Sequence, residues 1–212
     1  MILGLVAVVV IIVIAAVMSS KNKPGGDNNT ANVDKKPAVE APADAQPYVP
    51  EGAVTNAEGE LAIPEVLKEA SIVVVGANPI AKDGTVINST GDEVQNNADA
   101  MSLQAPKQTP PIAKDNLPKS VIKLEVTAGG WNPREFTVKP GEPVTLAIIS
   151  GDSLTHVFMF DDSSLSAVAV GVGPKETRAI TFNAPDKAGE YSFHCDVPGH
   201  ASRGETGKMI VK

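Results

Sequence analysis

The chain has 212 residues, of which only 4% are aromatic, and it contains 18 glycines and 17 prolines. This composition does not suit one large hydrophobic core, so we expect a small domain together with much non-globular chain. The formal net charge is −7, and without a basic patch the sequence excludes nucleic acid as a partner.

Residues 2–18 form an uncharged and almost wholly apolar stretch. At about 1.5 Å per residue, a helix of this length reaches roughly 25 Å, just short of the hydrocarbon core of a bilayer. We therefore predict that residues 1–20 are a membrane anchor or a signal segment. The anchor is favoured, because the stretch is long for a signal peptide and residues 15–18 make a poor cleavage site.

Residues 21–60 are rich in Pro, Ala, Asn and acidic side chains and contain few large apolar residues. Such a composition cannot offset the entropy lost on ordering, so it predicts a disordered linker. Lys21 and Lys23 open this stretch, and by the positive-inside rule they favour a cytoplasmic location for the chain after the anchor.

Residues 61–118 predict a partly ordered arm. The pattern allows one or two helical turns at 64–70 and a small β-hairpin from the β-branched runs 71–75 and 85–88. A second linker is expected at 105–118, which contains four prolines. The sequence leaves open whether this arm packs on the next domain or forms an independent module.

Residues 119–212 alternate between apolar and polar side chains in short runs separated by Gly- and Pro-containing turns. About seven strands at this spacing indicate an all-β fold, an antiparallel Greek-key β-sandwich. The expected strands are 121–127, 136–138, 144–148, 154–160, 177–183, 191–195 and 208–212.

Cys195 is the single cysteine of the chain, and His156 and His200 are two of its three histidines. Because side chains alternate along a strand, His156 points inward if its apolar neighbours do, and so does Cys195. The turn after Cys195 then brings His200 back beside it. A thiolate and two imidazoles suit copper, since soft sulfur stabilises Cu(I) and nitrogen accepts both oxidation states.

Three segments, TAGGWNPREFTVKPGEPV, LTHVF and YSFHCDVPGHASRGETGKMIV, together resemble the cupredoxin (plastocyanin/azurin-like) family over residues 119–212. The resemblance implies a type 1 copper site formed by His156, Cys195 and His200, with His200 at the exposed edge through which electrons leave. The family usually has a weak axial methionine where this chain has Glu205.

Three interpretations of Glu205 stay open. It binds the metal through a carboxylate oxygen, it turns away, or it marks a site that has changed to another metal. As a hard anionic ligand, a carboxylate would favour Cu(II) and lower the reduction potential. Met209 is not expected to replace it, because on a strand Met209 lies about 13 Å farther on at roughly 3.3 Å per residue.

Other polar and aromatic residues near these positions have structural interpretations. His194 points outward by strand parity, so we expect it at the surface or beside the ligands rather than among them. Trp131 is expected in the core or packed at one end of the sandwich. Residues 161 and 162, both aspartates, are expected in a solvated turn.

These features predict a membrane-tethered mononuclear copper protein that carries single electrons between transient redox protein partners. The membrane contact is residues 2–18, and copper chemistry and the family resemblance place the domain on the extracytoplasmic side, or outside the cell if the segment is cleaved. We expect no enzyme and no small-molecule substrate, because a type 1 site offers no open position. The alternatives are copper delivery or storage, a zinc site, and a metal-free adhesion sandwich.

Overall fold

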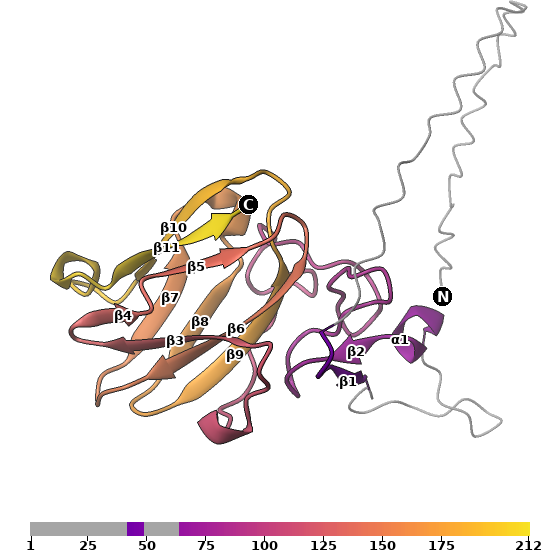
Figure 1. The fold of residues 1–212 in the computed structure, drawn as a ribbon, viewed down its shortest axis with the longest axis horizontal. Coiled ribbons are helices and arrows are strands. Elements are labelled where there is room, and N and C mark those ends of the chain that lie inside the picture. The colour runs from indigo at the N-terminus through magenta and orange to yellow at the C-terminus, as the bar shows by residue number, and fades with distance from the viewer. Residues whose placement is uncertain (1–41, 49–63) are drawn as a thin grey trace, which may run out of the picture. The chain divides into compact units, whose positions relative to one another are not determined.

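Two β-sheets packed face to face form most of the computed structural model, which describes residues 42–48 and 64–212 (Figure 1). The described residues belong to one compact unit, residues 36–212. The predicted membrane segment, residues 2–18, lies outside the described residues. Within the described ranges, no helix is long and apolar enough to span a membrane.

The two sheets have five and four strands. The five-stranded sheet has the order β5-β11-β10-β7-β8, with β5 at Glu135–Val138, β7 at His156–Phe160, β8 at Ala169–Val172, β10 at Gly189–Cys195 and β11 at Thr206–Val211. The four-stranded sheet has the order β4-β3-β6-β9, with β3 at Ile122–Thr127, β4 at Gly130–Asn132, β6 at Pro143–Ser150 and β9 at Thr177–Asn183. The predicted strands are all present in part or whole, whereas β4 and β8 are additional, because their short Gly-containing sequences lack clear alternation.

The sandwich is not wholly antiparallel. Strand β3 runs parallel to β6, and β11 runs parallel to β5. The antiparallel prediction is therefore wrong for these two pairs. The reason is that the chain leaves β4 for the other sheet and returns only at β6, and parallel neighbours need such a crossover in place of a hairpin.

Aromatic side chains fill the space between the sheets. Phe158 and Phe193 are fully buried, and their ring centroids lie 5.0 Å apart. Trp131 meets both rings edge-on, at centroid distances of 5.6 and 5.7 Å. This arrangement of the aromatic quadrupoles is favourable. It confirms Trp131 as a core aromatic residue.

Strand β6 is buried on both faces, because the arm covers the outer one. Leu146 and Ile148 belong to the core between the sheets, whereas Ala147 and Ile149 pack in a second apolar cluster. The arm contributes seven buried residues to this second cluster: Val73, Val74, Ala77, Ile80, Val86, Val94 and Leu117. The arm therefore packs on the sandwich, which is one of the two alternatives that the sequence leaves open.

Hydrogen bonds join the arm to the edge of β9. The backbone N–H of Thr109 donates to the carbonyl oxygen of Ala179 at 2.8 Å, and the Ala179 N–H donates to Thr109 Oγ1 at 2.9 Å. Ile112 N–H donates to the Thr177 carbonyl oxygen at 2.9 Å. The otherwise unpaired strand edge is thereby covered, as sheet edges in soluble proteins usually are.

The short elements of the arm differ in part from the predicted ones. Helix α1, Glu65–Lys68, lies within the predicted helical turns. The predicted hairpin does not form between its two runs: strand β2, Ser71–Ile72, pairs with β1, Gln46–Pro47, and Ile80 bridges both Ser71 and Val86. The predicted second linker contains the 3-10 helix η1, Lys114–Asn116.

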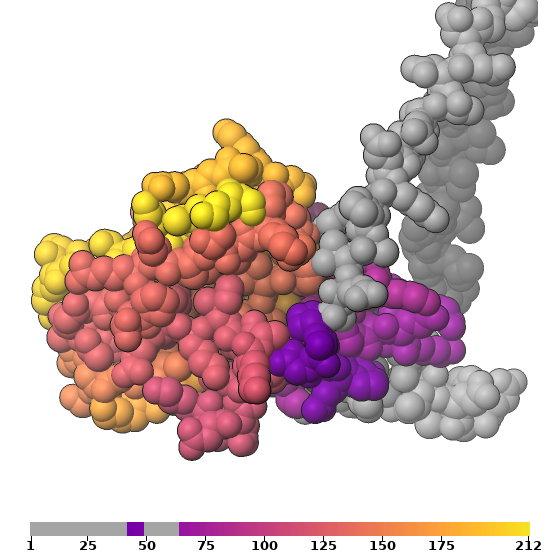
Figure 2. All heavy atoms as spheres, viewed as in Figure 1, coloured from indigo at the N-terminus to yellow at the C-terminus, as the bar shows by residue number. Residues whose placement is uncertain are grey.

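Residues 42–48 lie within the predicted disordered linker, yet they are ordered against the rest of this unit. Besides forming β1, they place Asp44, whose carboxylate accepts hydrogen bonds from the backbone N–H and the hydroxyl of Ser120. In Figure 2 the indigo atoms of residues 42–48 lie directly against the neighbouring atoms of the domain. The prediction of disorder is wrong for these residues, since a polar sequence can be ordered by contacts that its composition does not show.

Candidate metal centre

Adjacent strands place His156 and Cys195 at the same end of the sandwich. Cys195 is the last residue of β10 and pairs with Phe158 of β7, and His156 lies two residues before Phe158 on the same face. His156 is fully buried and Cys195 is 1% exposed. Strand alternation therefore turns both side chains inward, as the sequence pattern predicts.

The loop after Cys195 brings His200 and Glu205 to the same place. His200 precedes the 3-10 helix η3, Ala201–Arg203, and Gly204 comes next with a φ of 97°. Glycine adopts this left-handed conformation without strain, so the chain reverses here. The backbone of Glu205 then pairs with that of Cys195, whose N–H donates to the Glu205 carbonyl oxygen at 3.0 Å.

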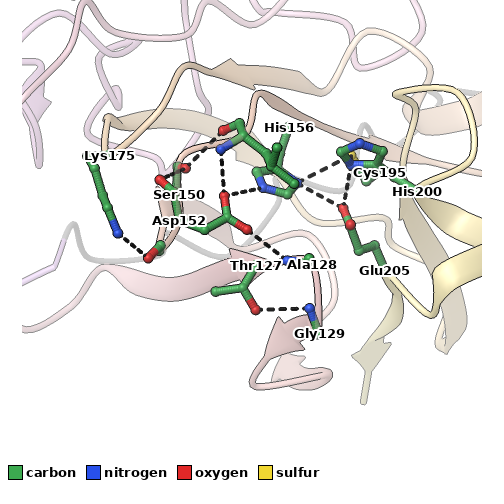
Figure 3. A network of polar contacts seen from close by, with 12 residues as sticks. Thr127, Ala128, Gly129, Ser150, Asp152, His156, Lys175, Cys195, His200 and Glu205 are labelled. Carbon is green, nitrogen blue, oxygen red and sulfur yellow. Dashed lines mark hydrogen bonds and ion pairs between the residues drawn. The ribbon is translucent and has the colours of Figure 1, made fainter.

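The ligand-type atoms of His156, Cys195, His200 and Glu205 all lie within 4.8 Å of one another (Figure 3). Glu205 Oε2 is 2.8 Å from His156 Nδ1 and 2.9 Å from His200 Nδ1. Cys195 Sγ is 3.8 Å from the first of these nitrogens and 3.5 Å from the second. All four side chains are buried, so this end of the sandwich holds one thiol, two imidazoles and one carboxylate away from bulk water.

The contacts of His156 show that this set of residues fits a metal ion. Its Nδ1 faces the Glu205 carboxylate, and its Nε2 lies 3.1 Å from Asp152 Oδ1. A neutral imidazole carries only one N–H, so it cannot donate to both carboxylates. A cation bound by Glu205 and both histidines would take the place of the proton that is missing between His156 and Glu205. The four residues could therefore hold one metal ion.

Burial and hydrogen bonding act differently on the two acidic groups of the centre. Burial raises the pKa of the Cys195 thiol, although the backbone N–H of Val157 donates to its sulfur at 3.3 Å. Burial also opposes ionisation of Glu205. Hydrogen bonds from His156 and Arg203, among others, outweigh it and hold the pKa of Glu205 below its usual value. Glu205 is therefore a carboxylate, which is the form that binds metals.

The residues that the sequence pattern places outside the ligand set lie elsewhere. Met209 is fully buried in the core and pairs with Tyr191, four residues before Cys195 on β10. His194 is partly exposed, and its Nδ1 contacts Asp161 at 2.5 Å, outside the group of four. Asp162, next to Asp161 in an exposed turn, accepts a hydrogen bond from the backbone of 3-10 helix η2, Ser163–Leu165.

Two polar residues of the centre are not among the predicted ones. Asp152 contacts His156 Nε2, and Arg203 Nη2 donates to Glu205 Oε1 at 3.2 Å. Asp152 stands four residues before His156, and Arg203 two before Glu205. Asp152 lies in a loop and Arg203 in a three-residue 3-10 helix, and neither is long enough to give a periodic pattern in the sequence, so only the structure identifies them.

Together, the β-sandwich and the buried group of two histidines, one cysteine and one glutamate define a small protein domain with a single candidate metal centre in the described part of the chain. The family model described as "Cupredoxin-like domain" matches residues 100–211, which is more than half of the chain. The chain therefore belongs to the cupredoxin-like family, and the predicted resemblance is confirmed.

Relatives of known name match the same part of the chain. Nitrous-oxide reductase from Pseudomonas fluorescens is 33% identical over 95 residues, which are 43% of this chain and 14% of that protein. Chloroplastic plastocyanin from Oryza sativa subsp. indica is 33% identical over 90 residues, which are 38% of this chain and 54% of that protein. The chain thus matches only about a seventh of the reductase and about half of the plastocyanin.

Solved structures of similar proteins include an auracyanin and an amicyanin. Reduced auracyanin from Roseiflexus castenholzii is 22% identical, with 44% of this chain and 98% of that chain covered and a TM-score of 0.40. Amicyanin from Paracoccus versutus is 24% identical, with 50% and 98% covered and a TM-score of 0.36. These TM-scores are low, and the family assignment rests on the match to the family model.

Proposed function

We propose that this protein is an electron carrier with one copper ion bound by His156, Cys195, His200 and Glu205. The observation that supports it most strongly is the convergence of these four side chains within 4.8 Å at the buried end of a cupredoxin-like sandwich. Copper bound by this set supplies a one-electron Cu(I)/Cu(II) couple.

The fold contributes rigidity to this function. His156 and Cys195 stand on neighbouring hydrogen-bonded strands, and the backbone bond between Cys195 and Glu205 fixes the returning loop. Ligand positions held in this way need little rearrangement when the charge of the metal changes. That property favours the transfer of single electrons over the making or breaking of bonds.

The proposed partners are redox proteins that bind transiently. His200 is 7% exposed and lies closest to the surface of the four residues. The neighbouring loop residues Val197, Pro198, Gly199 and Ala201 are small or apolar. Small apolar contacts of this kind suit weak redox encounters. We propose no small-molecule substrate, because the four side chains fill the positions around the metal.

We also propose the domain organisation and location that the sequence suggests. Residues 119–212 form the copper-binding domain, residues 61–118 its arm, and residues 1–20 a membrane anchor or signal segment. The domain then lies on the extracytoplasmic side of the cell membrane. The apolar character of residues 2–18 and the copper chemistry of the centre support this location.

Zinc is the second candidate metal, and the presence of a carboxylate, Glu205, among the four side chains favours it. Two imidazoles, a thiolate and a carboxylate are all common zinc ligands, and four of them complete a tetrahedral structural site. A zinc-loaded centre would not turn over electrons, so the protein would then serve as a metal-binding module.

The absorption spectrum distinguishes the two candidates. The purified full chain is loaded with Cu(II), and its visible absorption and EPR spectra are recorded before and after addition of ascorbate. The electron carrier gives an intense thiolate-to-copper band that ascorbate bleaches and that returns on reoxidation. A colourless protein that retains zinc in the presence of equimolar copper would overturn the proposed function.

A further inference from the structure

Asp152 is the one carboxylate besides Glu205 that the structure shows in contact with the metal-centre histidines, within the residues it describes. Its Oδ1 lies 3.1 Å from Nε2 of His156, on the side of the ring opposite Glu205 (Figure 3). The side chain of His156 is fully buried, and that of Asp152 is 24% exposed. Asp152 thus connects the buried ring to the surface of the domain.

The position of Asp152 is fixed by its own hydrogen bonds. Its Oδ2 accepts the backbone N–H of Ala128 at 2.8 Å, and its Oδ1 also accepts the backbone N–H of Leu154 at 2.8 Å. These two bonds hold the carboxylate of Asp152 in one orientation, with Oδ1 facing His156 Nε2.

A neighbouring turn holds the backbone on both sides of Asp152. Lys175 donates its backbone N–H to the carbonyl oxygen of Asp152 at 3.2 Å and its Nζ to the carbonyl oxygen of Gly151 at 2.5 Å. Lys175 has a φ of 61°, a left-handed conformation that side chains other than glycine rarely adopt. A residue held in this conformation indicates that the surrounding contacts determine the turn.

We propose that Asp152 is a positioning residue for the metal centre, which fixes the proton of His156 on Nε2 and leaves the Nδ1 lone pair directed at the metal. This inference rests on the proposed function. Histidine ligands commonly donate their second nitrogen to an acceptor that fixes the tautomer and increases the basicity of the ring. In this chain the acceptor is a full carboxylate, and its negative charge also favours the oxidised metal.

Two substitutions separate the hydrogen bond of Asp152 from its charge. Asp152→Asn with its oxygen at the Oδ1 position still accepts from His156 Nε2 and Leu154, but it removes the charge and the acceptor of the Ala128 N–H. Asp152→Ala removes both. Asp186→Asn is the matched control, since Asp186 is exposed and lies beyond the Asn183 end of β9, opposite the end of the sandwich that holds the centre.

The first measurement needs no copper. The Nε2–H of His156 is followed by ¹H–¹⁵N NMR in the zinc-loaded protein, where a diamagnetic metal occupies the Nδ1 side of the ring and Nε2 alone carries the proton. A hydrogen-bonded, slowly exchanging Nε2–H is expected in the wild type, in Asp152→Asn and in the control, and its protection from exchange is lost in Asp152→Ala. Thermal unfolding of each variant shows that the fold is kept. A wild-type Nε2–H that exchanges rapidly, or an equally protected one in Asp152→Ala, would overturn the inference.

The second measurement uses copper-loaded protein. Asp152→Ala is expected to bind copper roughly 10–100-fold more weakly, as is usual when such a supporting partner is removed. Asp152→Asn should bind it more tightly than Asp152→Ala and should show a raised reduction potential, because an anion near the metal is gone. If both variants match the wild type in affinity and potential, Asp152 has no such role. A wild type that binds no copper would overturn the proposed function, whereas the Nε2–H measurement on the zinc-loaded protein would still test Asp152.

Discussion

Arg203 and Glu205 form an ion pair at the edge of the metal centre, with Arg203 Nη2 donating to Glu205 Oε1 at 3.2 Å. The guanidinium is partly exposed, whereas the carboxylate is fully buried. One oxygen of Glu205 is thus occupied by Arg203, and the other faces both histidine Nδ1 atoms. The pair directs the carboxylate toward the centre, so in this structure the Glu205 side chain does not turn away from it.

Replacing Glu205 by methionine is expected to raise the reduction potential of the copper-loaded protein. A thioether is neutral and soft, so it favours Cu(I), whereas a carboxylate is hard and favours Cu(II). Cyclic voltammetry of Glu205→Met against the wild type measures the change. Met209→Leu is the control, because Met209 is a core residue, and its potential should stay at the wild-type value. An unchanged potential in Glu205→Met would mean that Glu205 is not a ligand.

Replacing Arg203 by alanine is expected to shift the potential in the opposite direction. Its positive charge offsets part of the charge of Glu205, so its loss stabilises the more highly charged metal ion and lowers the potential. Arg178→Ala is the matched control, since Arg178 pairs with Glu176 and contacts none of the four centre residues. Redox titration of both copper-loaded variants in the presence of a mediator gives the sign of the change in reduction potential. A raised potential in Arg203→Ala would contradict the expected effect of its charge.

Replacing Cys195 by serine is expected to remove the intense visible band of the copper-loaded protein. The hydroxyl of serine occupies similar space but does not supply the sulfur orbitals from which the charge-transfer absorption arises. Far-ultraviolet circular dichroism should stay close to the wild type, because the substitution changes a single side-chain atom and leaves the backbone bond from Cys195 to Glu205 in place. A visible band that survives in Cys195→Ser would assign the colour to another group.

Much of the centre can be predicted from the sequence because strand alternation is strict. The inward direction of Phe158 fixes that of His156, and the inward direction of Phe193 fixes that of Cys195, whatever the connection between the strands. Asp152 and Arg203 could not be predicted in this way. Asp152 lies in a loop and Arg203 in the short 3-10 helix η3, and the contacts of both depend on the three-dimensional path of the chain.

The contacts of the arm could not be predicted from the sequence either. The composition of residues 42–48 indicates disorder, whereas contacts distant in the sequence, the pairing of β1 with β2 and the contact between Asp44 and Ser120, 76 residues apart, place them against the rest of the unit. The parallel pairing of β3 with β6 is equally non-local. Alternation predicts which face of a strand is buried, but it does not predict which strand lies beside it.

The arm is expected to stabilise the sandwich through Thr109. This side chain is fully buried, and its hydroxyl accepts the N–H of Ala179 on β9. Thr109→Val removes the acceptor and leaves a buried N–H without a partner, which costs about 1–3 kcal/mol in the free energy of unfolding. Thr109→Ser keeps the hydroxyl and should lose less. Urea denaturation of both variants measures the difference, and equal stabilities would show that the arm is not bound through this contact.

Gly207 is expected to tolerate no side chain, because β11 approaches its neighbours closely there. A Cβ at this position would lie 2.4 Å from both the carbonyl oxygen of Arg134 and Cζ of Phe193. Gly207→Ala should therefore destabilise the fold by about 1–3 kcal/mol through overpacking. Gly171 on β8 is the matched control, since a Cβ there meets no atom within 4 Å. Thermal unfolding should show a clear loss for Gly207→Ala and little change for Gly171→Ala. Because Gly207 lies two residues after Glu205, the same shift of β11 should broaden the EPR signal of the copper-loaded protein, and an unchanged signal at reduced stability would show that the centre is insulated from the strand.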